Sequence, residues 1–303
     1  MKNIIRRMHR VLVEIEYSIL KYIGAKFHIA NAEETVDYII KNKVSVSRYG
    51  DGELDMIFKL LTNGKYSLSN SFQVYDDSLA HRLHDILKEG CTEKHIVCIP
   101  YWFKGGINQY KPDTRYFCKR YYCKNIKLIL NCTDFNKKYY NANFTRFYNS
   151  FIDKSDCQAK VAAIKKIWDN KEICIVEGEY SRLGVGNDLF SNATGIIRIL
   201  CPAQNAYAHY NGILNTILQK VSRNRLILIA LGHTATVLAY DLCVNNYQAI
   251  DIGHIDIEYE WMLMRAKDKV PVNNKYVNEV GNKTSCSQCL DSVYNSQILA
   301  RIK

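Results

Sequence analysis

Short apolar, β-branched runs recur along the chain, and each is followed by a stretch with helical character. Strands that alternate with helices favour a largely parallel sheet with helices on both faces, so we predict an α/β fold. The run 226–231 is apolar at every position, as a strand buried on both faces requires. The expected strands are 44–47, 95–99, 126–130, 172–176, 195–200, 226–231 and 247–252.

Three parts of the chain differ in composition, and we expect one main domain with two appendages. Residues 1–30 form an amphipathic helical extension, since apolar residues repeat at helical spacing among arginines and lysines. Such a helix could lie on a membrane surface, but Glu14 and Glu16 would repel anionic lipid and favour packing on the domain. Residues 31–280 form the domain, and the polar residues 281–303 form a C-terminal appendage.

Composition is that of an ordinary globular protein, with 303 residues, 48% hydrophobic and 23% charged. The chain contains no run of about 18 apolar residues, so we expect a cytoplasmic protein without a membrane span. Eleven irregularly spaced cysteines favour reduced thiols over disulfides. Cys286 and Cys289 have metal-like spacing but lack two further zinc ligands. The net charge of +11 fits nucleic acid, an anionic membrane surface or a phosphorylated small molecule equally well.

In parallel sheets, ligands bind beyond the carboxyl ends of the strands, so the residues that follow each apolar run are the first candidates. After the run 44–47, two glycines flank an acidic pair, Asp51 and Glu53. Carboxylate oxygens suit Mg²⁺ or Mn²⁺, and Arg48 offers a fork of donors to phosphate. An acidic pair at a helix start is also typical of ordinary capping.

The loop 176–188 follows another apolar run and contains three glycines, Arg182 and Asn187. Backbone N–H groups near Gly178 and Gly186, together with the arginine, could cradle a diphosphate or a sugar. The spacing differs from that of a dinucleotide fingerprint or a P-loop. A plain surface turn is the alternative.

The apolar run 226–231 ends in Gly232, and Thr234 opens the helix that follows. The N-terminus of such a helix binds anions well. An ordinary strand-to-helix turn with a threonine cap would have the same pattern.

Five titratable residues occupy every second or third position from the end of the run 247–252 onward. They are Asp251, His254, Asp256, Glu258 and Glu260. On a helix that starts near Asp256, Asp256 and Glu260 share one face, because they are four residues apart. A general base or a second metal ligand could come from this group. The segment 275–279 is a minor candidate.

Together these stretches resemble the GT-D-fold glycosyltransferases, a bacterial family first catalogued as a domain of unknown function. The resemblance covers about residues 32–279. One departure is His233, which stands where a proline or a small residue is expected. The residues that carry the resemblance are 48–53, 177–178, 181–190, 201–202, 205–206, 231–232, 234–241 and 251–261.

The resemblance implies a Rossmann-like domain that transfers a hexose, typically glucose from UDP-glucose, to a hydroxyl group of a glycan, glycoprotein or lipid-linked acceptor. It also implies a divalent ion, Mn²⁺ or Mg²⁺, held by Asp51 and Glu53. The residues expected near the donor are Arg48, Tyr49, Gly50, Gly178, Arg182, Gly186, Asn187, Gly232 and Thr234. The catalytic candidates are His254, Asp256 and Glu260.

Two other functions use some of the same features. A metal-dependent phosphohydrolase acting on nucleotide diphosphates would need carboxylates and basic residues, usually enough of them to hold two metals. A nucleic-acid-binding protein would suit the net charge and the 22 tyrosines, but no recognisable nucleic-acid module occurs in the sequence.

Overall fold

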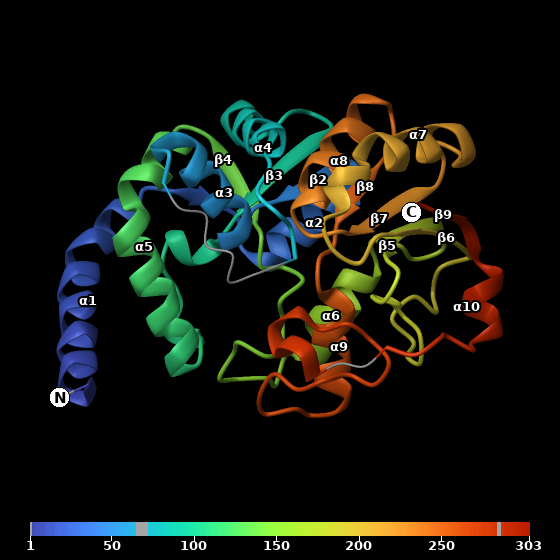
Figure 1. The fold of residues 1–303 in the computed structure, drawn as a ribbon. Helices are drawn as coiled ribbons and strands as arrows, with labels where there is room; N and C mark the ends of the chain where they lie inside the picture. Colours follow the sequence, from blue (N-terminus) through green and yellow to red (C-terminus); the bar gives the residue numbers. More distant parts are fainter. Residues whose placement is uncertain (1, 65–71, 284–285) are drawn as a thin grey trace.

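The computed structural model describes residues 2–64, 72–283 and 286–303. In this part of the chain, one parallel sheet is ordered β1-β4-β3-β2-β8-β7-β5-β6-β9 (Figure 1). The strands are β1 His28–Ile29, β2 Ser45–Arg48, β3 His95–Ile99, β4 Lys138–Asn141, β5 Glu172–Gly178, β6 Gly195–Cys201, β7 Leu226–Ala230, β8 Ala249–Asp251 and β9 Ile298–Arg301. The predicted α/β fold is confirmed.

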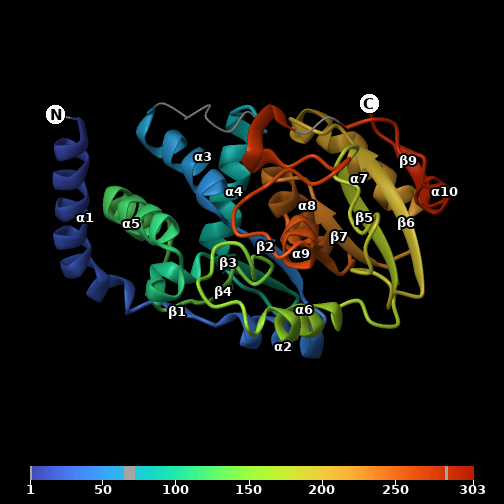
Figure 2. The same cartoon turned by 90° about the horizontal axis from the view of Figure 1, so that it is seen from below.

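Helices cover both faces of the sheet. Figure 2 shows α2 and α6 along one side and α3, α4 and α7 along the other. The α-helices are α1 Lys2–Gly24, α2 Ala32–Asn42, α3 Asp51–Thr62, α4 Asp77–Glu89, α5 Pro112–Cys132, α6 Cys157–Lys165, α7 Tyr210–Lys220, α8 His233–Val244, α9 Ile255–Leu263 and α10 Ser292–Ser296. Short 3₁₀ helices are η1 Tyr101–Phe103, η2 Ile107–Gln109, η3 Ala206–His209 and η4 Asn278–Lys283.

The core explains why the strands are apolar at successive positions. In β5, Ile173 and Ile175 pack in a cluster with α2, α6 and α9, whereas Cys174 and Val176 pack in a cluster with α7 and α8. Because successive side chains of a strand point to opposite faces, burial on both faces needs an unbroken apolar run. A third cluster joins α3, α4 and α5 to β3.

One predicted strand is wrong. Residues 126–130 lie in the last turns of α5, where Ile126 and Ile129 are buried at the spacing of a helix. These residues continue the face begun by Cys118 and Tyr122, and no turn residue interrupts the pattern. The strands β1, β4 and β9 were not predicted. The tail beyond Val280, expected to be an appendage, supplies β9, which pairs with β6 at the sheet edge.

Two further features concern the chain as a whole. All eleven cysteines are free, and seven of them are buried. Within the described ranges, none of the helices is long and apolar enough to cross a bilayer.

The sheet has a switch point between β2 and β8. The chain leaving β2 continues to β3 on one side, whereas the chain leaving β8 continues to β9 on the other. Ligands of open α/β sheets bind in the crevice that such a reversal creates beyond the carboxyl ends of the strands. Two of the predicted motifs follow these two strands.

Candidate active site

The acidic turn after β2 lies against the start of α8. Asp51 is the first residue of α3, and the Oε2 atom of Glu53 accepts a hydrogen bond of 2.8 Å from the backbone N–H of Gly50. A Cβ atom on Gly52 would lie only 2.7 Å from Nε2 of His233, so glycine is needed for this close approach. The Nδ1 atom of His233 is 3.8 Å from Oε1 of Glu53. The His233 departure therefore belongs to the site, because its ring packs on the glycine between the two acids.

The two acids of this turn influence each other. Asp51 keeps contact with solvent, yet the protein around it raises the pKa of its carboxyl group by desolvation, and the Glu53 charge raises it further. Arg146 and His233 are near enough to oppose this shift. A pair of carboxylates in such an arrangement suits a hard divalent cation, which commonly takes only one or two protein carboxylates. The donor set therefore fits the expected ion.

Arg48 lies beneath the turn that follows β8. Its Nη1 atom donates to the Thr145 hydroxyl at 2.5 Å, and a Cβ atom on Gly253 would lie 2.8 Å from Nη1. Burial raises the pKa of Asp251, the last residue of β8, to about 7, although Arg48 opposes the rise. The charge of Glu53 raises the pKa of Asp251 further, so the charged side chains at the ends of β2 and β8 influence one another.

Arg146, on the loop after β4, gathers three titratable side chains. Its Nη1 atom is 2.7 Å from Glu279 Oε1 and 3.5 Å from Glu258 Oε1. Its Nη2 atom is 2.7 Å from Nδ1 of His254. Glu258 is itself buried and accepts from the backbone N–H groups of residues 148 and 149 at 2.9 Å. The loop that carries Arg146 is thereby held in place.

This pairing determines what His254 can do. An arginine is always a donor, so Nδ1 of His254 accepts and Nε2 carries the proton. About a third of the side chain, 35%, is exposed, yet burial lowers the pKa of His254 to about 4. Glu279 opposes this shift and Arg146 adds to it. His254 is therefore a neutral hydrogen-bond donor through Nε2 at neutral pH.

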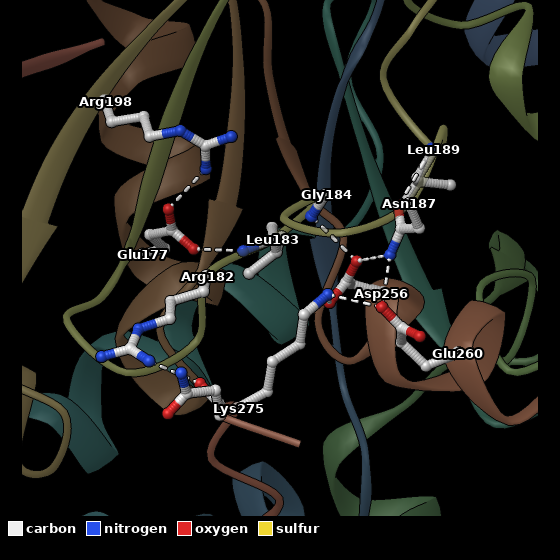
Figure 3. A network of polar contacts seen from close by, with 11 residues as sticks. Glu177, Arg182, Leu183, Gly184, Asn187, Leu189, Arg198, Asp256, Glu260 and Lys275 are labelled. Carbon is white, nitrogen blue, oxygen red and sulfur yellow. Dashed lines mark hydrogen bonds and ion pairs between the residues drawn. The ribbon is translucent and has the colours of Figure 1, made fainter. Parts of the chain in front are cut away.

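The predicted glycine loop after β5 is held from inside by carboxylates (Figure 3). Oδ1 of Asp256 accepts from the backbone of Gly184 at 2.8 Å and from Nδ2 of Asn187 at 2.9 Å. The same Nδ2 atom donates to Glu260 at 2.7 Å. Lys275 joins both acids, at 2.7 Å from Asp256 and 2.8 Å from Glu260. Asp256 and Glu260 do share one face of α9, and that face binds the loop.

The remainder of this loop is also anchored. Glu177 is fully buried, is 2.6 Å from Nη1 of Arg198 and accepts from the backbone of Leu183 at 2.7 Å (Figure 3). Arg182 donates to the backbone carbonyls of Asn274, at 2.7 Å, and Ser287. Its guanidinium therefore ties the loop to the segments near 274 and 287. These contacts favour a structural role for Arg182 over the predicted binding of phosphate.

The turn at Gly232 and the start of α8 are covered by Phe72 and Gln73. A Cβ atom on Gly232 would lie 2.5 Å from the Phe72 ring, and that ring stacks on Tyr276 with centroids 6.4 Å apart. Thr234 is fully buried, with its hydroxyl 3.4 Å from Oε1 of Gln73. The start of α8 is thus packed against Phe72 and Gln73.

Three predicted donor-site residues have other surroundings. Tyr49 is fully buried in the core, and its hydroxyl donates to the Leu83 carbonyl at 2.8 Å. A Cβ atom on Gly178 would lie 3.2 Å from the backbone of Ala203, so Gly178 allows a close chain contact. Gly186 has a φ of 78°, and a Cβ atom on it would extend into open space, so this part of the loop faces outward.

The structure thus separates the predicted residues into two groups. Arg48, Asp51, Glu53 and His254 surround the switch point, whereas Arg182, Asn187, Asp256 and Glu260 stabilise the glycine loop. Sequence reasoning missed Arg146, because it lies in a loop without a motif. Lys275 and Glu279 belong to the segment 275–279, which the sequence offers only as a minor candidate. Among the described residues, no group of three or more His, Cys, Asp or Glu side chains gathers as a metal-ligand set.

Comparison with known proteins identifies relatives across most of the chain. A family model described as the glycosyltransferase GT-D fold matches residues 46–280. The chain is 36% identical over 313 residues to glycosyltransferase GlyD of Streptococcus pneumoniae serotype 4, a match that covers 97% of this chain and 35% of that protein. It is 35% identical over 275 residues to the probable glycosyl transferase Gly of Streptococcus gordonii, a match that covers 90% of this chain and 39% of that protein. The chain therefore spans less than half the length of these relatives.

Solved structures agree with this match. A structure of the highly conserved domain of unknown function 1792, described as having a distinct glycosyltransferase fold, has a TM-score of 0.87 and 38% identity. The match covers 95% of this chain and 100% of that one. A new glycosyltransferase of the same domain type from Streptococcus sanguinis has a TM-score of 0.83 and 34% identity, over 91% of this chain and 100% of that one.

Proposed function

The chain belongs to the GT-D glycosyltransferase family, and on that premise we propose that it transfers a hexose, glucose first among the candidates, from a UDP-sugar to a hydroxyl group of a glycan, glycoprotein or lipid-linked acceptor. The observation that carries the proposal is the acidic turn of Asp51 and Glu53 at the β2/β8 switch point, within electrostatic reach of Arg146 and His233. A UDP-sugar has both a diphosphate that needs charge neutralisation and hydroxyl groups that need donors.

The acidic turn would hold Mn²⁺ or Mg²⁺ through Asp51 and Glu53. Such an ion supplies electrophilic stabilisation of the charge that develops on the diphosphate leaving group. Oε2 of Glu53 already accepts from Gly50, so the ion would be held by Oε1 of Glu53 and by the Asp51 carboxylate. Desolvation and, after it, the charge of Glu53 raise the pKa of Asp51, and a bound cation would offset both effects, which supports this role.

The surrounding cations and the histidine would orient the donor. Arg146 is held by Glu258 and Glu279, so its position is fixed before a ligand arrives. A preorganised charge of this kind stabilises a developing negative charge without first having to reorganise. His254 would donate through Nε2 to an oxygen of the substrate. The contacts of Asp256 and Glu260 support a role in positioning the glycine loop rather than in proton removal.

The test compares wild type with Asp51→Asn, which preserves size and removes the charge that the ion needs. With Mn²⁺, UDP-glucose and an acceptor, we expect UDP release to fall by about 100-fold or more in the variant, as for loss of one electrostatic partner in a transition state. Asp85→Asn is the matched control, since its side chain is 72% exposed on α4. We expect UDP-glucose with Mn²⁺ to raise the melting temperature of wild type, and EDTA to cancel that effect.

Two outcomes would contradict the proposal. If Asp51→Asn transferred the sugar at the wild-type rate, the acidic turn would not be part of the active site. Rapid hydrolysis of UDP-glucose that no acceptor changes would favour the phosphohydrolase.

A further inference from the structure

Helix α1 lies at one edge of the molecule, beside α5, in both Figure 1 and Figure 2. One face of α1 packs on α5 through Val13 and Tyr17, which are 6% and 8% exposed. Tyr17 makes an edge contact with Tyr122, at 6.1 Å between ring centroids, and Nδ1 of His9 is 2.7 Å from the Tyr116 hydroxyl. The predicted packing of this helix on the domain is therefore observed, but it uses only one face.

A second apolar face of α1 points to solvent, and we call it the α1 stripe. Its side chains are each between 52% and 69% exposed. Apart from Val11, they are spaced by four, three, four and three residues, so they align along one face of the helix, away from Val13 and Tyr17. Contiguous exposed apolar surface of this kind marks a site of interaction with a protein or a membrane. The stripe consists of Met8, Val11, Leu12, Ile15, Ile19 and Tyr22.

A basic cleft borders the α1 stripe. A cavity of about 440 Å³ lies between α1 and the loop 104–108, and three lysines, Lys21, Lys104 and Lys119, line it. Tyr22 belongs to both the cleft and the stripe. Glu14 also lines the cleft, but it is paired with Lys119, which offsets its charge. The cleft therefore has an excess of positive charge directly beside exposed apolar side chains.

The neighbouring helix adds further positive charge at this edge. Arg120, Lys124 and Lys127 of α5 are all exposed. On α1 itself, Arg7 and Lys21 are exposed, as is Glu16. Peripheral proteins bind anionic bilayers through this combination, in which exposed apolar side chains are flanked by cations.

We propose that the α1 stripe and the basic cleft dock the protein on an anionic phospholipid surface, with the stripe at the level of the acyl chains and with Lys21 and Lys104 on the headgroup phosphates. A second copy of the chain could also pack on the stripe, since the four-three spacing suits a helix partner. The charges favour the bilayer, because the basic groups beside the stripe would repel the same groups of another copy. Pairing of Glu14 with Lys119 removes one of the two negative charges that the sequence sets against membrane contact.

The test is co-sedimentation of the whole chain with phosphatidylcholine vesicles, with and without phosphatidylglycerol. We expect binding to the anionic vesicles that weakens as salt is raised. The double variant Leu12→Glu with Ile19→Glu should reduce binding by about tenfold or more, since it places charge where apolar area must insert. Lys21→Gln should reduce binding by about fivefold, in keeping with one lysine near an anionic surface.

The matched control is Val244→Glu, which makes the same change at a 65% exposed apolar side chain at the end of α8. It should bind vesicles as wild type does. Circular dichroism checks the fold of each variant, and Lys21→Gln and the salt series test the proposal independently of the stripe substitutions.

Two results would overturn the proposal. One is absence of wild-type binding to anionic vesicles. The other is equal binding by wild type and the double variant. Sedimentation velocity that shows a dimer of wild type, a monomer of the double variant and no vesicle binding would assign the stripe to a second copy instead.

Discussion

Replacement of Arg182 by alanine should destabilise the unliganded protein. The side chain is only 3% exposed, and its guanidinium donates to the backbone carbonyls of Asn274 and Ser287. A hydrogen bond from a charged group contributes about 1.5–3 kcal/mol, and the alanine variant also leaves two carbonyls to find water. We expect a loss of about 2–4 kcal/mol. For a chain of this size, about 1 kcal/mol lowers the melting temperature by roughly 2–4 °C, so Arg182→Ala should melt roughly 4–16 °C lower.

The backbone conformation of Arg182 allows two contributions to the loss of stability to be measured separately, namely the missing guanidinium and the backbone strain of a residue other than glycine. Arg182 has a φ of 50°, a left-handed conformation that favours glycine. Arg182→Gly should therefore be more stable than Arg182→Ala by up to about 1 kcal/mol, although both lack the guanidinium. Arg182→Lys should recover part of the stability, because an ammonium cannot reproduce the planar fork that reaches two carbonyls.

The assay measures melting temperatures without ligand and then the kinetics of UDP release, on the same preparations. Arg120→Ala, at an exposed position of α5, is the control for loss of an arginine charge and should melt like wild type. An unchanged melting temperature in Arg182→Ala, together with a raised KM for UDP-glucose, would refute the structural role. The guanidinium would then bind the donor's phosphates, as its position in the sequence suggested.

Two other predictions concern the ends of β2 and β8. Gly52→Ala should lower stability by about 1–3 kcal/mol and reduce transfer, because a Cβ atom 2.7 Å from His233 Nε2 must displace that ring. Gly212→Ala is the control: its nearest neighbour would be at 3.8 Å and it lies in α7, so it should melt at or slightly above the wild-type temperature. Burial raises the pKa of Asp251 from 3.8 to about 7, so between these values the native state holds a proton that the unfolded state has lost, and stability falls as pH rises. Asp251→Asn should therefore gain stability relative to wild type as pH rises from about 4 to about 7, and a melting-temperature difference that does not change with pH would contradict the assignment.

Most of the sheet could be predicted because its central strands are buried on both faces. Such burial leaves a continuous apolar run, as in β7, where four of five residues are buried. Two of the missed strands lack this signal, because β1 has two residues and β9 lies at the sheet edge with alternate residues exposed. The third, β4, is buried at three positions, but its sequence Lys-Tyr-Tyr-Asn contains no aliphatic residue. The segment 126–130 shows the opposite error, since a buried helix and a buried strand look alike over five residues.

Less of the site could be predicted, because the role of a charged side chain depends on partners that are distant in the sequence. The shared face of Asp256 and Glu260 follows from helical spacing, but Lys275, which binds both, comes from a separate segment. Arg146 likewise meets His254 and Glu279, which are 108 and 133 residues away in the chain. No local pattern encodes such contacts.

The carboxylates that hold the glycine loop differ from those of the acidic turn in how many protein groups already bind their oxygens. This difference is a physical reason to assign the two groups different roles. Buried polar groups in a native protein are satisfied by the protein itself, as Asp256 is by Gly184, Asn187 and Lys275. A carboxylate whose oxygens already accept hydrogen bonds from the protein gains little from a ligand, and it would lose its contacts with the loop if it moved. Asp51, in contrast, is exposed, and its pKa is raised by desolvation and by Glu53. A cation bound there would offset the desolvation and the repulsion that raise this pKa, and this is the physical reason for our proposal that the metal and the donor bind at the β2/β8 end of the site.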